Sequence, residues 1–250
     1  MKTMNRKGFL KSLGLAGVTA VAAPLLIHCG SDDDSIAGSS TVSSGSGSGT
    51  GSSSTGCSVT NSETEGPFPT KSPSGLVQSN IVSDRTGVPL TITITIQNVN
   101  AGCTALQGAI VDIWHCDKDG NYSEYGGTGM QSANYTSVHF LRGRQTTDSN
   151  GLVGFTSIFP GWYNGRATHI HVHIYNSSGQ SLLVTQIAFQ EGSDSAVAQV
   201  AASTGYKGMT GYTYNTNDNV FSDGTSNEMS SISGSVSGGF TLIHTIKVSA

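Results

Sequence analysis

Apolar and polar residues alternate along most of the chain after residue 90. From Leu90 to Ile96, Leu or Ile occupies every second position and Thr the positions between, as in a strand with one buried face. The same period predicts further strands at Ala109 to Trp114, Leu152 to Ile158, Ile170 to Tyr175, Leu182 to Phe189 and Thr241 to Val248.

Turn-forming clusters such as Asp117-Lys118-Asp119-Gly120 separate these strands. Only Ser193 to Ser203 has a helical pattern, with Ser193 or Asp194 as its expected N-cap. Many short strands, long loops and at most one short helix predict an all-β fold, an antiparallel β-sandwich with a prealbumin-like core.

The first 28 residues have the features of a signal peptide. A basic cluster containing Lys2 and Arg6 precedes an apolar run of about fifteen residues, which is too short to span a bilayer comfortably. Leu26-Ile27-His28-Cys29 looks like a lipobox, although a small residue is expected where His28 stands. We therefore expect an exported protein, lipid-anchored through Cys29 at the cell envelope or surface of a Gram-negative-type bacterium. Plain secretion to the periplasm or medium and a retained anchor helix are the alternatives.

Composition divides the rest of the chain in two. Residues 29–56 are almost entirely Ser, Gly, Thr and Asp and form a flexible linker, whereas residues 57–250 carry the strand pattern of one domain. The net charge of the whole chain is −4. Loss of residues 1–28 removes four basic residues and no acidic one, leaving −8. This acidic balance excludes nucleic acid as an expected partner and limits membrane contact to the lipid anchor.

Three cysteines remain beyond the lipobox. An oxidising compartment would permit one disulfide and one free thiol. Cys103 and Cys116 flank one predicted strand and are too far apart along it to bond, so we favour Cys57 with Cys103.

The densest polar feature is the segment Arg166-Ala167-Thr168-His169-Ile170-His171-Val172-His173-Ile174. On a strand its three histidines share one face and the apolar residues occupy the other. Neighbouring histidines of the three are close enough to bind one metal, and this spacing alone suits zinc, copper or iron. Tyr163 lies six residues before His169, and Tyr122 lies in the turn Asp119-Gly120-Asn121-Tyr122. Two phenolates beside two imidazoles would favour a ferric ion.

Several motifs occur in order along the chain: Thr64 to Pro69, Val111 to Asp117, Tyr122-Ser123, Phe140 to Gly143, Thr147-Asp148, Phe159 to Tyr163, Arg166 to His171 and Thr185-Gln186. Together they resemble the intradiol ring-cleavage dioxygenases, and the stand-alone secreted members most of all. The helical N-terminal region by which the catechol-cleaving branch dimerises has no counterpart here, so the oligomeric state is left open.

The resemblance implies a non-haem Fe(III) bound by Tyr122, Tyr163, His169 and His171. It further implies catalytic roles for Tyr163, for Arg166 as the active-site arginine and for Gln186 in the same pocket. His173 has no ligand role in the family's pattern.

The implied reaction cleaves a catecholic ring with O₂ between its two hydroxyl-bearing carbons, giving a cis,cis-muconate-type diacid. A carboxylated substrate would need a free cation from Arg142, Arg144 or Arg166. Two other hypotheses compete with this one. The first is a metal-free surface sandwich that binds glycan or peptide, and the second is a zinc or copper site on His169, His171 and His173 without dioxygenase activity.

Overall fold

The structure, a computed structural model, describes residues 56–127 and 129–250. The signal peptide, Cys29 and nearly all of the linker predicted from the sequence lie outside the described residues. Within them, no helix has the length and apolar character that a membrane crossing requires.

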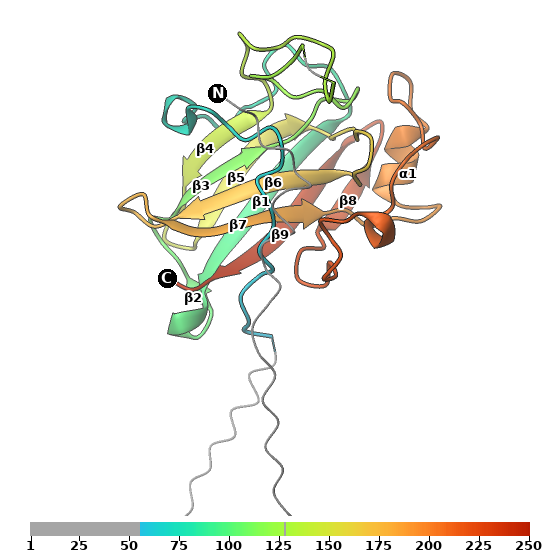
Figure 1. Cartoon of the computed structure of the whole chain (residues 1–250). Helices are drawn as coiled ribbons and strands as arrows, with labels where there is room; N and C mark the ends of the chain where they lie inside the picture. Colours follow the sequence, from blue (N-terminus) through green and yellow to red (C-terminus); the bar gives the residue numbers. More distant parts are fainter. Residues whose placement is uncertain (1–55, 128) are drawn as a thin grey trace, which may run out of the picture. The chain divides into compact units, whose positions relative to one another are not determined.

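Two β-sheets form the domain, as the sequence predicted. The first contains β1 (Pro89–Asn98), β2 (Thr104–Ala105), β5 (Leu152–Ile158), β8 (Ser231–Ser235) and β9 (Gly239–Val248), in the order β2-β1-β9-β8 with β5 also paired to β1. The second contains β3 (Ile110–Trp114), β4 (Arg142–Thr146), β6 (His169–Tyr175) and β7 (Ser181–Ala188), in the order β4-β3-β6-β7. Figure 1 shows the second sheet stacked in front of the first.

The core lies between the sheets. Ile92, Ile94 and Ile96 of β1 are fully buried, and the alternate residues Ile170, Val172 and Ile174 of β6 join them in one apolar cluster. This burial leaves the histidines of β6 on the opposite face of the second sheet, as the alternation predicted.

One strand pair departs from the antiparallel prediction. β1 pairs with β5 in the antiparallel sense but with β9 in parallel, with Leu90 opposite Phe240. A parallel pair needs a long connection, and β1 and β9 stand at opposite ends of the domain sequence, so no hairpin turn dictates their direction.

The helix is shorter than predicted and begins later. Helix α1 spans Ala196–Ala201, and the side chain of Ser195, rather than that of Ser193 or Asp194, accepts the capping bond from the Ala198 backbone N–H at 3.2 Å. Single-turn 3₁₀ helices occur at Pro73–Gly75, Val99–Ala101 and Asn215–Asn217.

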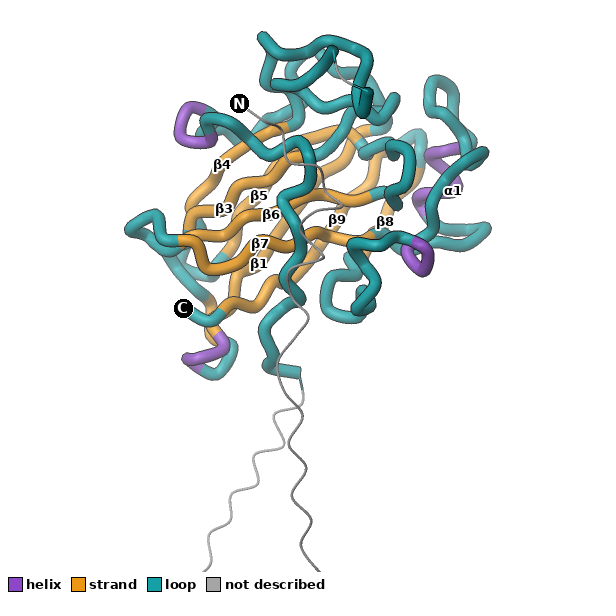
Figure 2. Tube along the Cα trace, in the orientation of Figure 1, coloured by secondary structure: helices purple, strands orange, loops and turns teal. Residues whose placement is uncertain are grey.

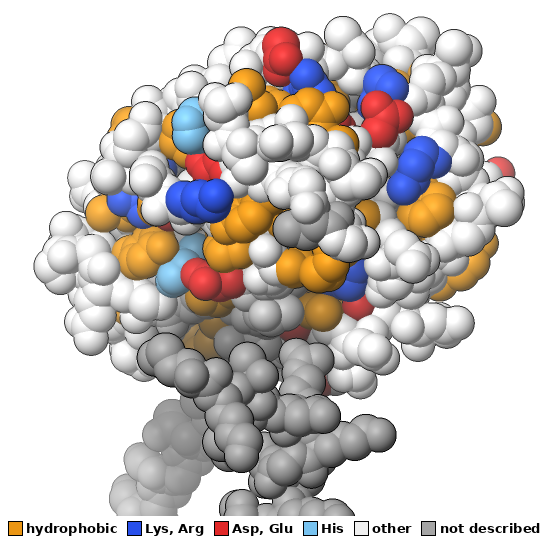
Figure 3. All heavy atoms as spheres, turned by 45° about the horizontal axis from the view of Figure 1, so that its top comes forward, with side chains coloured by type: hydrophobic (Ala, Val, Ile, Leu, Met, Phe, Trp, Pro, Cys, Tyr) orange, Lys and Arg blue, Asp and Glu red, His pale blue; other side chains and the backbone are white. Residues whose placement is uncertain are grey.

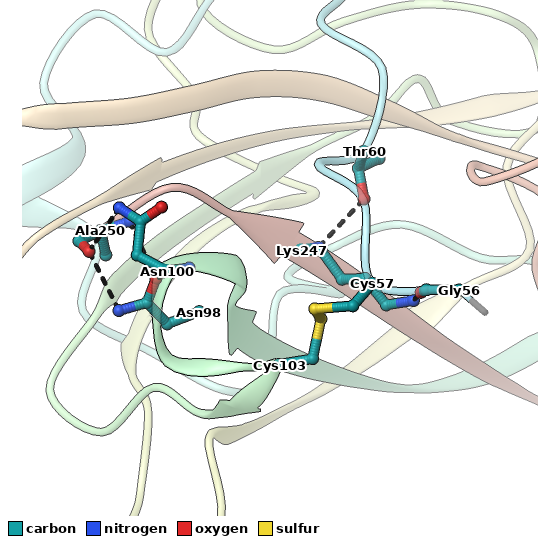
Figure 4. Close-up of a disulfide and its surroundings, with 8 residues drawn as sticks. All are labelled: Gly56, Cys57, Thr60, Asn98, Asn100, Cys103, Lys247 and Ala250. Atoms are coloured by element: carbon teal, nitrogen blue, oxygen red, sulfur yellow. Dashed lines mark hydrogen bonds between the residues drawn. A yellow bond between two sulfur atoms is a disulfide. The ribbon is translucent and has the colours of Figure 1, made fainter. Parts of the chain in front are cut away.

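The segment that precedes β1 crosses the exposed face of the second sheet (Figures 1 and 2). Its beginning is attached by a disulfide between Cys57 and Cys103, which confirms the favoured pairing, and Cys116 is free and buried. Figure 4 shows this disulfide beside the hydrogen bond between Thr60 and Lys247. The crossing segment is therefore fastened to the first sheet before it reaches the second.

Acidic and basic side chains are mixed with hydrophobic ones on the loop-rich end of the domain (Figure 3). On the face in view, the described residues do not form the continuous basic stripe typical of a nucleic-acid-binding surface.

Candidate metal centre

His169 and His171 point from β6 to a common centre. Their Nε2 atoms are 3.0 Å apart, and both side chains are at most 2% exposed. The Nδ1 of His169 donates to the backbone carbonyl of Ala167 at 2.6 Å. This hydrogen bond keeps the proton on Nδ1 and directs the Nε2 lone pair of His169 at the centre.

Tyr122 reaches the same centre from the loop after β3. Its hydroxyl lies 3.3 Å from the Nε2 of His169, and its ring stacks on Phe68 with centroids 4.7 Å apart. Gln131 holds the Tyr122 backbone in both directions: its Oε1 accepts from the Tyr122 N–H at 2.6 Å, and its Nε2 donates to the Tyr122 carbonyl at 2.8 Å. Tyr122 is therefore fully buried and fixed in position.

Tyr163 completes the group from the loop before β6 and is only half-buried. Its ring meets the rings of Tyr122 and His169 edge-on, with centroid distances of 5.6 and 5.7 Å. Its hydroxyl accepts a 3.4 Å hydrogen bond from Nη1 of Arg166. The four residues that the sequence singled out as metal ligands thus lie together.

Arg166 lies beside these four residues, and its guanidinium is held by hydrogen bonds to two other side chains. Its Nε lies 2.9 Å from both carboxylate oxygens of Asp218, and its Nη2 donates to Oε1 of Gln186 at 2.5 Å. The side-chain amide of Gln186 in turn donates to the carbonyl of Thr64 at 2.9 Å. Arg166 and Gln186, both predicted from the sequence, form one network at the site.

Burial dominates the electrostatics of the candidate ligands. It lowers the pKa of His169 and of His171 well below the ordinary value, and the positive charge of Arg166 lowers both further. Both imidazoles are therefore neutral near pH 7 and have a free lone pair. Burial also raises the pKa of Tyr122 and of Tyr163, against the opposing effect of Arg166, so a cation is needed to hold either as phenolate.

The donor set fits a metal ion. Two nitrogens that each lie roughly 2.1 Å from one metal at a right angle are about 3 Å apart, as the Nε2 atoms of His169 and His171 are. Two imidazoles and two phenols offer nitrogen and hard oxygen donors without a thiolate, which suits ferric iron better than a closed zinc site.

The crossing segment closes the site above His171. Gly66 has a φ of +67°, and a Cβ at this position would lie 3.0 Å from Cε1 of His171. The Trp114 indole, from β3, stacks parallel to the His171 imidazole with ring centroids 4.9 Å apart. The His171 ring is therefore confined between β3 and the segment.

His173 shares the strand face but not the centre. Its Nδ1 lies 3.0 Å from Oε1 of Glu65 and 2.8 Å from the hydroxyl of Tyr175, and its Nε2 lies 2.8 Å from Oγ of Ser181. Both ring nitrogens are thus engaged elsewhere, which argues against a site made by all three histidines.

None of the three arginines considered for a substrate carboxylate is free. Arg142 is fully buried and donates to the carbonyls of Phe68 and Ser123. Arg144 forms a two-bond ion pair with Asp112, and Arg166 is bound by Asp218.

Sequence reasoning missed Gln131 and Asp218. Asp218 belongs to a segment rich in Gly, Asn, Ser and Thr, and it lies 52 residues beyond Arg166. No periodic pattern marks either residue: Gln131 acts on Tyr122 within an irregular loop nine positions away, and Asp218 acts on Arg166 across 52 positions.

Comparisons with known proteins agree with this geometry. Residues 65–229 match the family model described as Dioxygenase. The chlorocatechol 1,2-dioxygenase of Rhodococcus opacus is 27% identical over 157 residues, which are 52% of this chain and 56% of the relative, so the chain matches little more than half of that protein's length.

Solved structures show the same fold. An intradiol ring-cleavage dioxygenase from Tetranychus urticae superimposes with a TM-score of 0.67 at 29% identity, covering 77% of this chain and 95% of that chain. The dioxygenase domain of a carbohydrate-binding fusion protein from Streptomyces sp. SirexAA-E gives 0.57 at 23% identity, covering 77% and 99%, and this likeness concerns the fold alone.

Proposed function

The chain belongs to the intradiol ring-cleavage dioxygenase family, and from this premise we propose that it is a non-haem Fe(III) enzyme that cleaves a catechol with O₂. The bond broken joins the two hydroxyl-bearing carbons. Both oxygen atoms enter the product, a cis,cis-muconate-type diacid, so no other oxidant or reductant is needed. One observation carries the proposal, the convergence of two imidazoles and two phenols from His169, His171, Tyr122 and Tyr163.

These four residues would hold the iron. Ferric iron, when bound there, supplies Lewis acidity and draws electron density from the substrate, so that the substrate becomes the partner that reacts with O₂. The neutral imidazoles would donate their Nε2 lone pairs to it, and Tyr122, which is buried and fixed by Gln131, would stay bound.

Tyr163 is the residue that exchanges protons. It is the less buried of the two phenols, and its hydroxyl is hydrogen-bonded to Arg166. Deprotonated when a cation is bound, its phenolate oxygen would take up a proton from a substrate hydroxyl, a general-base role.

Arg166 stabilises the negative charge that develops on the substrate during ring opening. A cation fixed in a buried site does this without reorganising during the reaction. Asp218 and Gln186 hold the guanidinium from two sides, which leaves Nη1 directed at Tyr163 and His169.

The substrate we propose is a catechol without a carboxylate. A carboxylated catechol such as protocatechuate needs a free cation, and Arg142, Arg144 and Arg166 are all paired within the protein. None of the three is therefore left unpaired to neutralise a carboxylate on the substrate ring.

Oxygen-uptake assays with the iron-loaded protein test this function. We expect one O₂ consumed per catechol, both atoms of ¹⁸O₂ in the diacid, and a kcat/KM for protocatechuate at least tenfold lower. Tyr122→Phe should abolish turnover, whereas Tyr214→Phe, which alters an exposed tyrosine, should not. Full activity of Tyr122→Phe, or no oxygen uptake with any catechol, would contradict the proposal.

We also propose that the domain works outside the cytoplasm on a lipid anchor at Cys29. The Cys57–Cys103 disulfide supports this location, because such bonds persist in oxidising compartments. Mass spectrometry of the membrane-bound protein should find a lipidated N-terminal Cys29, and Cys29→Ser should release the protein from membranes. An unprocessed N-terminus would contradict the anchor.

A further inference from the structure

Three carboxyl groups meet at the edge of the second sheet, outside the candidate metal centre. Glu63 comes from the crossing segment, and Asp223 and Glu228 come from the region before β8. One carboxylate oxygen of each lies within 4.8 Å of the other two. Residues about 160 positions apart in the sequence are thus brought together by the fold.

Within residues 56–127 and 129–250, no basic side chain forms an ion pair with this cluster. The ion pairs found between described residues do not include Glu63, Asp223 or Glu228. Arg166 is close enough to affect Glu63, but its charge is already paired with Asp218. Three acids therefore face one another, and the described part of the chain places no unpaired cation in an ion pair with them.

Glu228 adds an independent sign of a missing partner. Its side chain is fully buried, one oxygen accepts from Oγ1 of Thr185 at 3.2 Å, and Oε2 has no hydrogen-bond partner. A buried carboxylate oxygen without a partner is costly. Burial and the neighbouring acids raise the pKa of Glu63 to about 7 and that of Glu228 to about 8, so the charged forms lack compensation.

We propose that Glu63, Asp223 and Glu228 bind a calcium ion. The site offers only carboxylate oxygens, which are ligands of hard divalent cations rather than of zinc or copper. Two oxygens at roughly 2.4 Å from one Ca²⁺ lie no more than about 4.8 Å apart, as these oxygens do. Magnesium fits less well, because it keeps several waters and seldom uses a cage of several carboxylates.

The ion would join two segments that are both hydrogen-bonded to β7 beside the candidate metal centre. The backbone N–H of Glu63 donates to the carbonyl of Val184 in β7, and the N–H of Ala188 donates to the carbonyl of Glu228, both at 2.9 Å. Gln186, which contacts Arg166, lies between these two attachments on β7. Calcium therefore stabilises the edge strand that supports Gln186.

Calorimetric titration and thermal unfolding with CaCl₂ test the site. The purified protein, freed of calcium by dialysis and checked for unchanged iron content, should bind one Ca²⁺. Its Tm should rise by about 3–8 °C at millimolar Ca²⁺, and less with MgCl₂.

Two variants and a control make the test specific. Glu228→Gln and Asp223→Asn should each weaken calcium binding at least tenfold. Asp223 is exposed, so its variant should fold normally, and Asp194→Asn, at another exposed acid, should leave calcium binding unchanged. Absence of binding heat and of a Tm shift in the unaltered protein would overturn the proposal, as would calcium binding of full strength in both cluster variants.

Discussion

Arg166 owes its direction to Asp218. Both carboxylate oxygens of Asp218 accept a hydrogen bond from Nε of Arg166. The same carboxylate also accepts from the backbone N–H of Ala167 at 2.8 Å. None of these hydrogen bonds joins Asp218 to a candidate metal ligand, so Asp218 acts by positioning Arg166.

Asp218→Asn should lower kcat by roughly tenfold or more, because the guanidinium would lose its charged anchor. Iron content and the visible spectrum should stay unchanged, since the four candidate ligands are intact. Steady-state kinetics and metal analysis separate the two effects. Loss of iron from the variant would instead assign Asp218 a general structural role. An unchanged kcat would contradict the positioning role of Asp218.

Gly66 tests the confinement of His171. Gly66→Ala introduces a Cβ against the His171 ring at a φ of +67°, so it should lower both stability and iron retention. Gly179→Ala is the matched control, because Gly179 has a φ of +84° with open space around it. Both variants should lose about 1 kcal/mol of stability. Only Gly66→Ala should release iron faster to a chelator, and equal release rates would contradict the proposed contact.

At the scale of elements, the strands that could be predicted were those with one apolar face. The alternation of His and Ile in β6 indicated both the core face and the candidate ligands His169 and His171. β4 was missed because Arg142 and Arg144 occupy positions where a strand pattern would show apolar residues. Arg142 is buried through contacts with the loops that carry Phe68 and Ser123, and Arg144 pairs with Asp112 on the neighbouring strand β3. β8, with the sequence Ser-Ile-Ser-Gly-Ser, is too polar to be recognised.

The tyrosines show a similar limit. Strand spacing indicated a metal on β6 but not which one, and Tyr122 and Tyr163 were assigned from the family resemblance. Their approach to His169 depends on how two loops fold, and neither loop has a periodic pattern.

The crossing segment depends on the disulfide at its start. Cys57 and Cys103 close a loop of 46 residues, so replacing both by Ser should cost about 2–4 kcal/mol of unfolding free energy in urea. Iron should also be lost faster, because the segment carries Gly66 and Phe68 over the site. Reduction with dithiothreitol should reproduce the loss in the unaltered protein and have no effect on the variant. A variant as stable as the unaltered protein would show that the segment is held without the disulfide.

At the scale of the whole molecule, buried neutral histidines set the acid stability. Burial lowers the pKa of His115 and of His244 to about 4. The unfolded chain binds these protons near pH 6.5 and the folded chain does not, so stability falls as the pH drops below 6.5.

His244→Gln isolates one of these groups. When the pH is lowered from 6.5 to 5, the unfolding free energy of this variant should fall by roughly 1–2 kcal/mol less than that of the unaltered protein. Urea unfolding at both pH values, in calcium-free buffer, gives the comparison. Equal losses would mean that His244 is protonated in the folded state or does not contribute.

The most direct test of the account is the metal content and visible spectrum of the purified protein, prepared without chelators. We predict one iron per chain and a broad red-brown charge-transfer band that shifts when a catechol is added without oxygen. Tyr122→Phe should weaken or abolish this band. A protein that stays colourless after ferric reconstitution, or that holds zinc or copper instead, would contradict the central claim that two tyrosines and two histidines bind Fe(III).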